Sequence, residues 1–396
     1  LTTMDKGPKV ETVALNAKDG KVLWRREATM THPDKGKRLA TATPATDGEL
    51  VFSFFGSSGL HCYDAEGHPQ WMKDFGPLVN QFNHAASPLI VGNRVILLID
   101  HDGDSLLVAL DKQTGKELWR SHRFVFGRNY ASPVIWKSND ATWVLVIGSG
   151  VLVGYEVESG TPAWYVRSTC AVVNPSPVVG DNGWIYVHGS SPSSGAKSTP
   201  FGRLVKSYDG NQDEALQLEE LPPSFLKTFF SRFDRDTSGG ISEKEYDEFK
   251  DISRPFQKGM VAIKPGGAGE WSQSQLAWTV SRSMPRTPSA LYQSGVIYVV
   301  NEGGVLQSLD AKTGTVLHQG RIAARGTIYS SPVLGDGKIY IGTLNGEVTV
   351  ISAEPQWKTL HSAKLDSEIQ ACPAIADGRV YFRTKTSLYC FGLKDD

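Results

Sequence analysis

The fold is decided by stretches such as SPLIVGNRVILLIDHDGDSLLVALDKQTGKELW, residues 87–119. This stretch opens with a small residue and a proline, which lead into an apolar strand. It continues through a short strand, an Asp and a Gly turn to a last strand that ends in Trp119. Short strands separated by turns of Gly, Asn or Asp are typical of hairpins. The pattern therefore predicts a unit of four antiparallel strands.

Both halves of this unit recur along the chain. The opening prolines are Pro44, Pro88, Pro133, Pro177, Pro288, Pro332 and Pro373, at intervals of 44, 45, 44, 111, 44 and 41 residues. The second half ends in Trp24, Trp71, Trp119 and Trp164, continues more loosely at Trp278 and Trp357, and has His318 in one of these positions. A sheet repeated every 40–45 residues buries both of its faces when the copies pack radially, and such a ring leaves few exposed edges. The repeat predicts an all-β propeller.

The number of blades depends on the two ends of the chain. Seven proline half-units are preceded by LTTMDKGPKVETVALNAKDGKVLW, which lacks a first strand, and the final TSLYCFGLKDD has no Trp strand after it. We expect eight four-stranded antiparallel blades, of which the first and last are incomplete unless they complement each other. The alternative is seven blades, with the two ends merged into one. Each Trp is expected to fill the space between neighbouring blades, with its indole NH bound to a backbone carbonyl.

The combined pattern, xSPxxxxGxVY…ALDxxTGxxLW, resembles the quinoprotein-type (PQQ-like) β-propeller repeat over nearly the whole chain. That family includes periplasmic quinone-dependent alcohol and sugar dehydrogenases and a non-catalytic outer-membrane lipoprotein that helps assemble β-barrel proteins. The resemblance implies eight blades and an extracytoplasmic, periplasmic or secreted location. It does not choose between an enzyme and a scaffold, because a fold does not fix a function.

The residues favour the scaffold. The dehydrogenases of the family carry a vicinal Cys pair over the quinone, and the four cysteines here (Cys62, Cys170, Cys372 and Cys390) contain no adjacent pair. The chain shows no recognisable cluster of Glu, Asn and Asp that would hold calcium beside PQQ. Binding of PQQ is thus unsupported by a motif, and no catalytic residues are assigned. We interpret the cysteines as buried free thiols, with a disulfide as the alternative.

Composition excludes further classes. Lys and Arg total 41 against 42 acidic residues, for a net charge of −1, which argues against a protein that binds nucleic acid through a positive field. Apolar residues make up 40%, with 40 Gly and 21 Pro, as in a folded, turn-rich protein. No apolar run reaches the 18 residues that a transmembrane helix needs. The first residues, LTTMDKG, are typical of a strand, so we expect further sequence upstream.

One interval is about 67 residues longer than the others, which predicts an insertion. The expected organisation is a first propeller part at 1–189, an insertion at 190–258 that begins with a linker, SSPSSGAKSTP, and a second propeller part at 259–396. At the centre of the insertion stands FFSRFDRDTSGGISEKEYDEF, residues 229–249.

This segment matches the EF-hand calcium loop. Oxygen ligands are predicted at positions 1, 3, 5, 7, 9 and 12, which are Asp234, Asp236, Ser238, the Gly240 carbonyl, Ser242 and Glu245. Gly239 takes position 6, where the loop turns sharply, and Ile241 takes the apolar position 8. Glu245 would complete the oxygen cage of a hard cation with a bidentate carboxylate. No second loop is recognised, although such hands usually pair.

The flanking segments fit two helices. Phe225, Phe229 and Phe233 recur every four residues before the loop, and Ser224 is expected to start that helix. A lone hand would bury this stripe against the propeller or against another molecule. Three carboxylates in an extracellular setting imply an affinity on the order of 10⁻⁵–10⁻³ M, which fits a structural ion.

Propeller geometry places one further set of residues. The loops that lead into the first strand of each blade (the lead-in loops) and the turns between second and third strands should emerge on the same face, and the insertion should project from it. Lead-in residues predicted near the mouth of the central channel are His84, Asn129, Asn174, Arg286, Tyr329 and Gln370. Such converging polar groups often bind a ligand, and Arg286 is the one expected to meet an anion. The alternative is that they only bond the inner loops and water.

The leading hypothesis is a non-catalytic, calcium-binding, extracytoplasmic propeller that serves as a binding platform for a protein or a polysaccharide. The alternative is a PQQ-dependent dehydrogenase with its site at the channel mouth. Glycan binding, suggested by Tyr130 and Tyr329, is a third possibility. DHDGDS, residues 100–105, resembles a metal loop but lies where a turn between two strands is expected.

Overall fold

The computed structural model describes residues 1–4, 9–32, 40–80, 82–138, 141–167, 174–189, 197–252 and 259–392. The chain divides into two compact units. Unit 1 comprises Leu1–Val166, Ser193–Arg254 and Ala268–Glu270, and unit 2 comprises Arg167–Pro192, Pro255–Gly267 and Trp271–Asp396. The predicted insertion therefore falls largely in unit 1. None of the helices in the described ranges is long and apolar enough to cross a membrane.

Unit 1 contains four antiparallel sheets whose strands follow chain order. They are β1 (Thr2–Met4), β2 (Val10–Leu15) and β3 (Val22–Glu27); β4 (Ala45–Thr46), β5 (Leu50–Phe54), β6 (Leu60–Asp64) and β7 (Pro69–Lys73); β8 (Leu89–Val91), β9 (Arg94–Ile99), β10 (Leu106–Asp111) and β11 (Glu117–His122); and β12 (Val134–Lys137), β13 (Thr142–Gly148), β14 (Val151–Glu156) and β15 (Pro162–Arg167). A short strand, β21 (Gly269–Trp271), extends the last sheet beyond β15. A single helical turn, η1 (Gly56–Ser58), joins β5 to β6.

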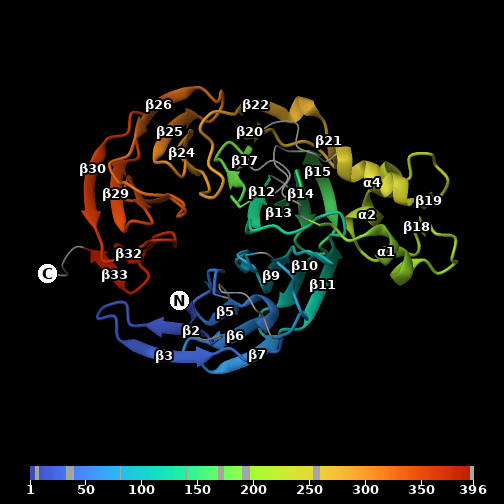
Figure 1. Ribbon diagram of the computed structural model, residues 1–396, viewed down its shortest axis with the longest axis horizontal. Helices are drawn as coiled ribbons and strands as arrows, with labels where there is room; N and C mark the ends of the chain where they lie inside the picture. Colours follow the sequence, from blue (N-terminus) through green and yellow to red (C-terminus); the bar gives the residue numbers. More distant parts are fainter. Residues whose placement is uncertain are drawn as a thin grey trace. The chain divides into compact units, whose positions relative to one another are not determined.

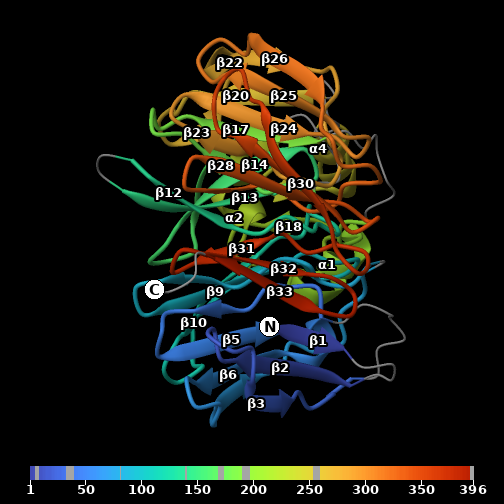
Figure 2. The same ribbon diagram turned by 90° about the vertical axis from the view of Figure 1, so that its left-hand side faces the viewer.

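Unit 2 contains four further sheets of the same kind, and Figure 2 shows the strands of the last one. They are β16 (Val178–Val179), β17 (Ile185–Gly189), β20 (Gly259–Ile263) and β22 (Leu276–Val280); β23 (Leu291–Gln293), β24 (Val296–Val300), β25 (Val305–Asp310) and β26 (Val316–Arg321); β27 (Val333–Gly335), β28 (Lys338–Gly342), β29 (Glu347–Ser352) and β30 (Thr359–Lys364); and β31 (Ala374–Ala376), β32 (Arg379–Arg383) and β33 (Leu388–Gly392). A helical turn, η2 (Gln273–Gln275), precedes β22. Gly189 at the end of β17 pairs with Gly259 at the start of β20, so the residues between them leave the sheet between its second and third strands.

These eight sheets are the blades of an eight-bladed β-propeller, as the repeat predicts, and the seven-bladed alternative is wrong. Among the described residues the first and last sheets have three strands each. The first contains the Trp strand but no strand before β1, and the last stops at its third strand, β33. Both departures agree with the expectation drawn from the two ends of the sequence.

A small residue adjacent to five of the prolines has a role that the pattern alone did not reveal. Its side chain accepts a hydrogen bond from the backbone NH of the equivalent residue in the preceding blade. In unit 1 the pairs are Thr43 N to Ser87 Oγ (3.0 Å) and Ser87 N to Ser132 Oγ (3.0 Å). In unit 2 they are Ser176 N to Ser289 Oγ (3.1 Å), Ser289 N to Ser331 Oγ (2.9 Å) and Ser331 N to Cys372 Sγ (3.1 Å). Consecutive first strands are thereby joined within each unit.

The repeated Trp joins consecutive blades at the opposite side of each sheet, as predicted for four of them. The indole NH groups donate to backbone carbonyls of the next blade: Trp24 to Ala65 (2.8 Å), Trp71 to Lys112 (3.0 Å), Trp119 to Val157 (2.9 Å) and Trp278 to Ala311 (3.0 Å). Each ring lies against a turn glycine with positive φ. A Cβ built on Gly115 (φ +69°), for example, would lie 2.6 Å from the Trp71 ring. Glycine is required there both for the turn and for the indole.

Two tryptophans depart from this prediction. Trp164 lies over Gly154 of its own sheet, where a Cβ would come within 2.1 Å of the ring, and packs edge-on against Trp136 at 5.7 Å. Trp357 packs back onto the preceding blade, against Gly320 and against His318, whose ring centroid is 4.9 Å away. In both cases the indole packs against a glycine within a strand, Gly154 or Gly320, where the missing side chain leaves room for the ring.

Candidate metal centre

The insertion folds as helices and two short strands that lie beside β11 and β15 in Figure 1. The elements are α1 (Phe201–Tyr208), β18 (Leu216–Gln217), α2 (Phe225–Thr228), α3 (Phe230–Phe233), β19 (Gly240–Ile241) and α4 (Glu243–Ile252). Ser224 begins α2, as expected, because its hydroxyl accepts the Lys227 NH at 3.1 Å. The helix breaks at Phe229, so the predicted first helix consists of two short pieces. Of the predicted linker at 190–200, residues 190–196 lie outside the described residues.

Three of the predicted ligands come together in the loop between α3 and α4. One carboxylate oxygen each from Asp234, Asp236 and Glu245 lies within 4.8 Å of the others. Asp234 and Glu245 are only 8% and 6% exposed. Three carboxylates this close repel one another in water and at neutral pH, and burial of two of them strengthens the repulsion. The group is suited to a hard divalent cation, which prefers oxygen ligands.

Backbone NH groups hold these carboxylates in place. Asp234 accepts from Ser238 N (2.9 Å) and Gly239 N (3.0 Å), and Glu245 accepts from Arg235 N (2.8 Å) and Ser242 N (2.9 Å). Burial alone would raise the pKa of Glu245, but the hydrogen bonds from Ser242 outweigh it and hold that pKa below its ordinary value. The carboxylate is therefore kept in its ionised form.

The other predicted ligands belong to the same cluster. The Ser238 hydroxyl donates to the Gly240 carbonyl at 3.2 Å, and the Ser242 hydroxyl donates to Glu245 Oε2 at 2.7 Å. Hydrogen bonds from Ser238, its hydroxyl first, also lower the pKa of Asp236. All six predicted residues thus belong to one hydrogen-bonded network, and their oxygen groups are of the kind that calcium prefers.

The aromatic stripe of the insertion is buried against unit 1. Phe225, Phe229 and Phe233 belong to one hydrophobic core with side chains of the third and fourth blades. Tyr165 of β15 packs against Phe229 with ring centroids 4.7 Å apart. Tyr246, the residue after the loop, donates from its hydroxyl to the carbonyls of Phe124 (3.0 Å) and Thr199 (2.8 Å). The loop is therefore attached to the propeller through the residue that directly follows it.

The insertion also contacts the face that carries the lead-in loops of unit 1. Lys197 N donates to Asp102 at 3.2 Å, and Arg203 pairs with Asp104 at 3.0 Å. Both aspartates belong to DHDGDS, the turn between β9 and β10. Its first carboxylate, Asp100, forms a bidentate ion pair with Arg123, and Asp102 pairs with Arg128 at 3.4 Å. These carboxylates have arginine partners, which corrects the suggestion of a metal loop at this turn.

The predicted lead-in residues differ in exposure. In unit 1, His84 and Asn129 are buried. Burial, and then the charge of nearby His101, lower the pKa of His84 to about 3. Asn129 donates to the Ile147 carbonyl and accepts from Tyr130 N at 2.9 Å. Both side chains therefore brace the inner part of unit 1.

In unit 2, Arg286, Tyr329 and Gln370 are exposed, and Asn174 donates to the Arg286 carbonyl at 3.2 Å. The turns between second and third strands hold these lead-in loops. Glu302 accepts from Arg286 N at 2.8 Å through its carboxylate and from Ile328 N at 3.2 Å through its carbonyl. Similarly, Leu344 N donates to Thr327 O (2.8 Å) and Ile369 N donates to Thr343 O (3.0 Å). The loops and turns of unit 2 thus lie on one face, and their common ligand stays a prediction.

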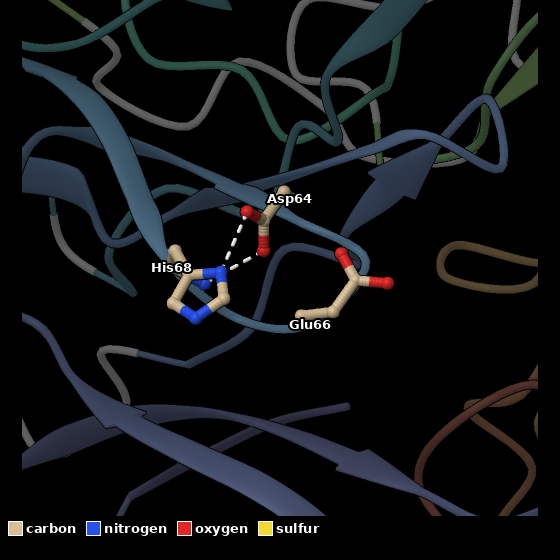
Figure 3. A group of neighbouring side chains, drawn as sticks. All are labelled: Asp64, Glu66 and His68. Atoms are coloured by element: carbon tan, nitrogen blue, oxygen red, sulfur yellow. Dashed lines mark hydrogen bonds and ion pairs between the residues drawn. The ribbon is translucent and has the colours of Figure 1, made fainter.

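A second acidic group of the described residues is Asp64, Glu66 and His68, at the turn between β6 and β7 (Figure 3). Asp64 accepts from the backbone NH of His68 at 2.7 Å and contacts its Nδ1 at 2.9 Å. The equivalent aspartates Asp111 and Asp310 cap their own turns in the same way, through Thr114 and Thr313. This group thus belongs to a turn that recurs in several blades.

The three described cysteines belong to none of the described metal-ligand groups. Cys62, Cys372 and Cys390 are free thiols; Cys62 is buried, as predicted, whereas Cys372 and Cys390 are exposed. Burial raises the pKa of Cys62 to about 12, so this thiol stays protonated. Cys170 lies outside the described residues.

Comparison with known proteins supplies a family. A family model described as "Outer membrane protein assembly factor BamB" matches residues 9–164, 103–199 and 257–395. The crystal structure of BamB from Moraxella catarrhalis is similar with a TM-score of 0.60 and 14% identity, covering 98% of this chain and 92% of that one. The computationally designed Ika8 protein is similar with a TM-score of 0.55 and 12% identity, covering 99% and 95%. No curated protein matches the chain in sequence. At these identities the two solved structures support the propeller fold alone.

Proposed function

Because the chain belongs to the family of the outer membrane protein assembly factor BamB, we propose that it is a non-catalytic propeller that binds a protein partner outside the cytoplasm. We propose further that its insertion holds a calcium ion. The calcium proposal rests on the close approach of the carboxylates of Asp234, Asp236 and Glu245. Their loop belongs to an insertion that shares a hydrophobic core with the propeller. Calcium would add rigidity to the insertion, since it neutralises buried carboxylates that otherwise repel.

The face of unit 2 that carries its lead-in loops supports the proposal that the chain binds a protein partner. Arg286 and Tyr329 are exposed on loops that Glu302 joins through backbone hydrogen bonds. Arg and Tyr are enriched among the residues that dominate binding energy at protein interfaces, because both combine a large flat surface with hydrogen-bond donors. The backbone bracing limits the entropy lost when a partner binds. We therefore place the partner on this face.

We expect the double change Arg286→Ala and Tyr329→Ala to weaken binding of a fluorescently labelled outer-membrane β-barrel polypeptide, diluted from urea, by roughly tenfold or more in an anisotropy titration. The control is Lys358→Ala with Leu360→Ala, which removes one exposed charge and one exposed apolar side chain at the β29–β30 hairpin of the same unit. Equal losses in both variants would place the partner elsewhere. Oxidation of alcohols or sugars after loading with PQQ and calcium would instead identify a dehydrogenase.

For calcium, we expect isothermal titration calorimetry to lose one binding event in Glu245→Gln, because the amide keeps the size of the side chain but cannot supply a bidentate carboxylate. Glu243→Gln is the matched control: Glu243 lies two residues away on α4, is exposed, and is not one of the predicted ligands. Circular dichroism of both variants verifies that the propeller stays folded. Unchanged titrations in Glu245→Gln would assign the calcium to another place.

A further inference from the structure

We propose that residues 209–220 form a second calcium site, paired with the loop at 234–245. This inference deepens the proposed function, since it gives the insertion two ions instead of one. The segment DGNQDEALQLEE starts directly after α1 (Phe201–Tyr208). Counted from its first residue, oxygen-bearing side chains fall at positions 1, 3, 5, 9 and 12 of a twelve-residue loop. They are Asp209, Asn211, Asp213, Gln217 and Glu220, with the Ala215 carbonyl at position 7.

The backbone of this segment repeats that of the predicted calcium loop. Positive φ angles occur at position 4 in both, at Gln212 (65°) and Thr237 (59°), and at position 6 in both, at Glu214 (65°) and Gly239 (93°). Non-glycine residues seldom adopt such angles, and two in one turn require a specific reason. The match is hard to recognise in the sequence because position 6, which is glycine in a typical EF-hand loop, is Glu214 here.

The carboxylates at the two ends of the segment are held as in the other loop. Asp209 at position 1 accepts the NH of position 6 at 3.0 Å, the same distance as between Asp234 and Gly239. Glu220 at position 12 accepts the NH of position 2, Gly210, at 2.7 Å and the NH of position 9 at 2.9 Å. The corresponding distances at Glu245 are 2.8 and 2.9 Å. The end carboxylates of both loops are thus held by NH groups at the same positions.

An independent observation points to a cation in this segment. The amide of Gln217 donates through Nε2 to Asp213 Oδ2 at 2.7 Å, while its Oε1 is fully buried and accepts no hydrogen bond from the described residues. A buried amide oxygen without a donor is unfavourable, and most such groups in proteins have a partner. The opposite orientation of the amide would set Oε1 against the Asp213 carboxylate. In either orientation an oxygen remains that a bound cation would satisfy.

The two loops are paired back to back. β18 and β19 form an antiparallel ladder in which Leu216 faces Ile241, and both residues occupy position 8 of their loops. Both are fully buried in the core that joins the insertion to unit 1. A Cβ on Gly240 would lie 3.0 Å from the Ala215 Cβ, so the ligand strands are in direct contact. Such contact couples the loops, because a shift of one ladder strand moves the other.

The stoichiometry of calcium binding tests the proposal. In equilibrium dialysis of the full chain against ⁴⁵Ca²⁺ at millimolar concentration, we expect two ions per chain, one ion in Glu220→Gln, one in Glu245→Gln and none in the double variant. Glu219→Gln, which removes the adjacent exposed carboxylate, is the matched control and should retain two. Asp213→Asn, at an exposed position that does not contribute to the core, should also reduce the number to one.

The possible results are distinguishable. One ion in the wild type that is lost in Glu245→Gln but kept in both Glu220→Gln and Asp213→Asn would overturn the second site and leave the first intact. One ion lost in Glu220→Gln and kept in Glu245→Gln would support the second site and overturn the first. No bound ion would overturn both.

Discussion

Replacement of Asp100 by alanine is expected to lower the free energy of unfolding by about 3–5 kcal/mol, since it leaves a buried charge without its partner. Asp100 follows β9 and Arg123 follows β11, and neither side chain has exposed surface. Their ion pair is bidentate, with Arg123 Nε 2.8 Å from Oδ1 and Nη2 3.0 Å from Oδ2. The guanidinium also donates to the Tyr155 hydroxyl of β14 and lies 4.0 Å from the Phe126 ring centroid.

The pair therefore links the third and fourth blades through the core of unit 1. Burial tends to lower the pKa of Arg123, but the charge of Asp100 and the contact with Tyr155 raise it above its ordinary value, so the guanidinium stays charged. Without Asp100 this cation would have to remain buried without a counterion or force the core open. Urea denaturation followed by tryptophan fluorescence measures the loss.

A double-mutant cycle separates the ion pair from simple loss of packing. Asp100→Ala combined with Arg123→Met should recover part of the loss, because removal of both charges leaves no unpaired ion. Glu11→Ala is the control: its pair with Arg25 spans 3.1 Å but is partly exposed, and such pairs contribute about 1 kcal/mol or less. A loss in Asp100→Ala no larger than in Glu11→Ala would contradict the structural role.

The sequence predicts the propeller because its signals are local and repeated. A proline after a small residue, a positive-φ glycine and a Trp recur along the chain, and four of the repeated Trp residues have the same surroundings. Trp71 illustrates this: the carbonyl that accepts its indole NH and the glycine against its ring both belong to the next repeat. Trp357 ends a looser version of this signal and packs onto the preceding blade instead, so its position depends on contacts that one repeat does not contain.

The insertion contains features that local sequence patterns do not predict. Spacing alone predicts the calcium loop from Asp234 to Glu245, whereas the segment at 209–220, which we propose as its partner, is concealed by Glu214 at the turn. The ladder in which Leu216 faces Ile241 joins this segment to the predicted loop, and no local sequence pattern reveals that pairing. In the same way, the charges of DHDGDS resemble ligands in sequence, and only the distant Arg123 and Arg128 show that they form ion pairs. The role of such charged residues therefore depends on partners that are distant in the sequence.

Acid is expected to destabilise the chain through two buried histidines. Burial lowers the pKa of His84 in unit 1 to about 3 and that of His188 in unit 2 to about 4, from an ordinary value near 6.5. Both are therefore neutral in the folded protein down to these values, whereas the unfolded chain takes up a proton at each below pH ~6.5. The unfolded state then binds more protons, so stability falls as the pH decreases from about 6.5.

The size of this effect follows from the two pKa values. Each histidine contributes about 1.4 kcal/mol per pH unit below 6.5, and the loss ends once the pH falls below the folded value. Between pH 6.5 and 4.5 each should cost about 2–3 kcal/mol. The two residues lie in different units, so their contributions should add. Above pH ~6.5 both states are neutral at these positions and the contribution is constant.

Variants isolate the two groups from the carboxylates that titrate in the same range. His84→Gln and His188→Gln should each flatten the dependence of the free energy of unfolding on pH between 6.5 and 4.5, whatever their effect on its absolute value. His361→Gln, at an exposed position on β30, should leave the slope unchanged. Urea titrations at half-unit pH steps give the slopes. If the slopes of His84→Gln and His188→Gln equalled that of the wild type, both histidines would have to accept protons while folded, and the buried sites described for them would have to admit water.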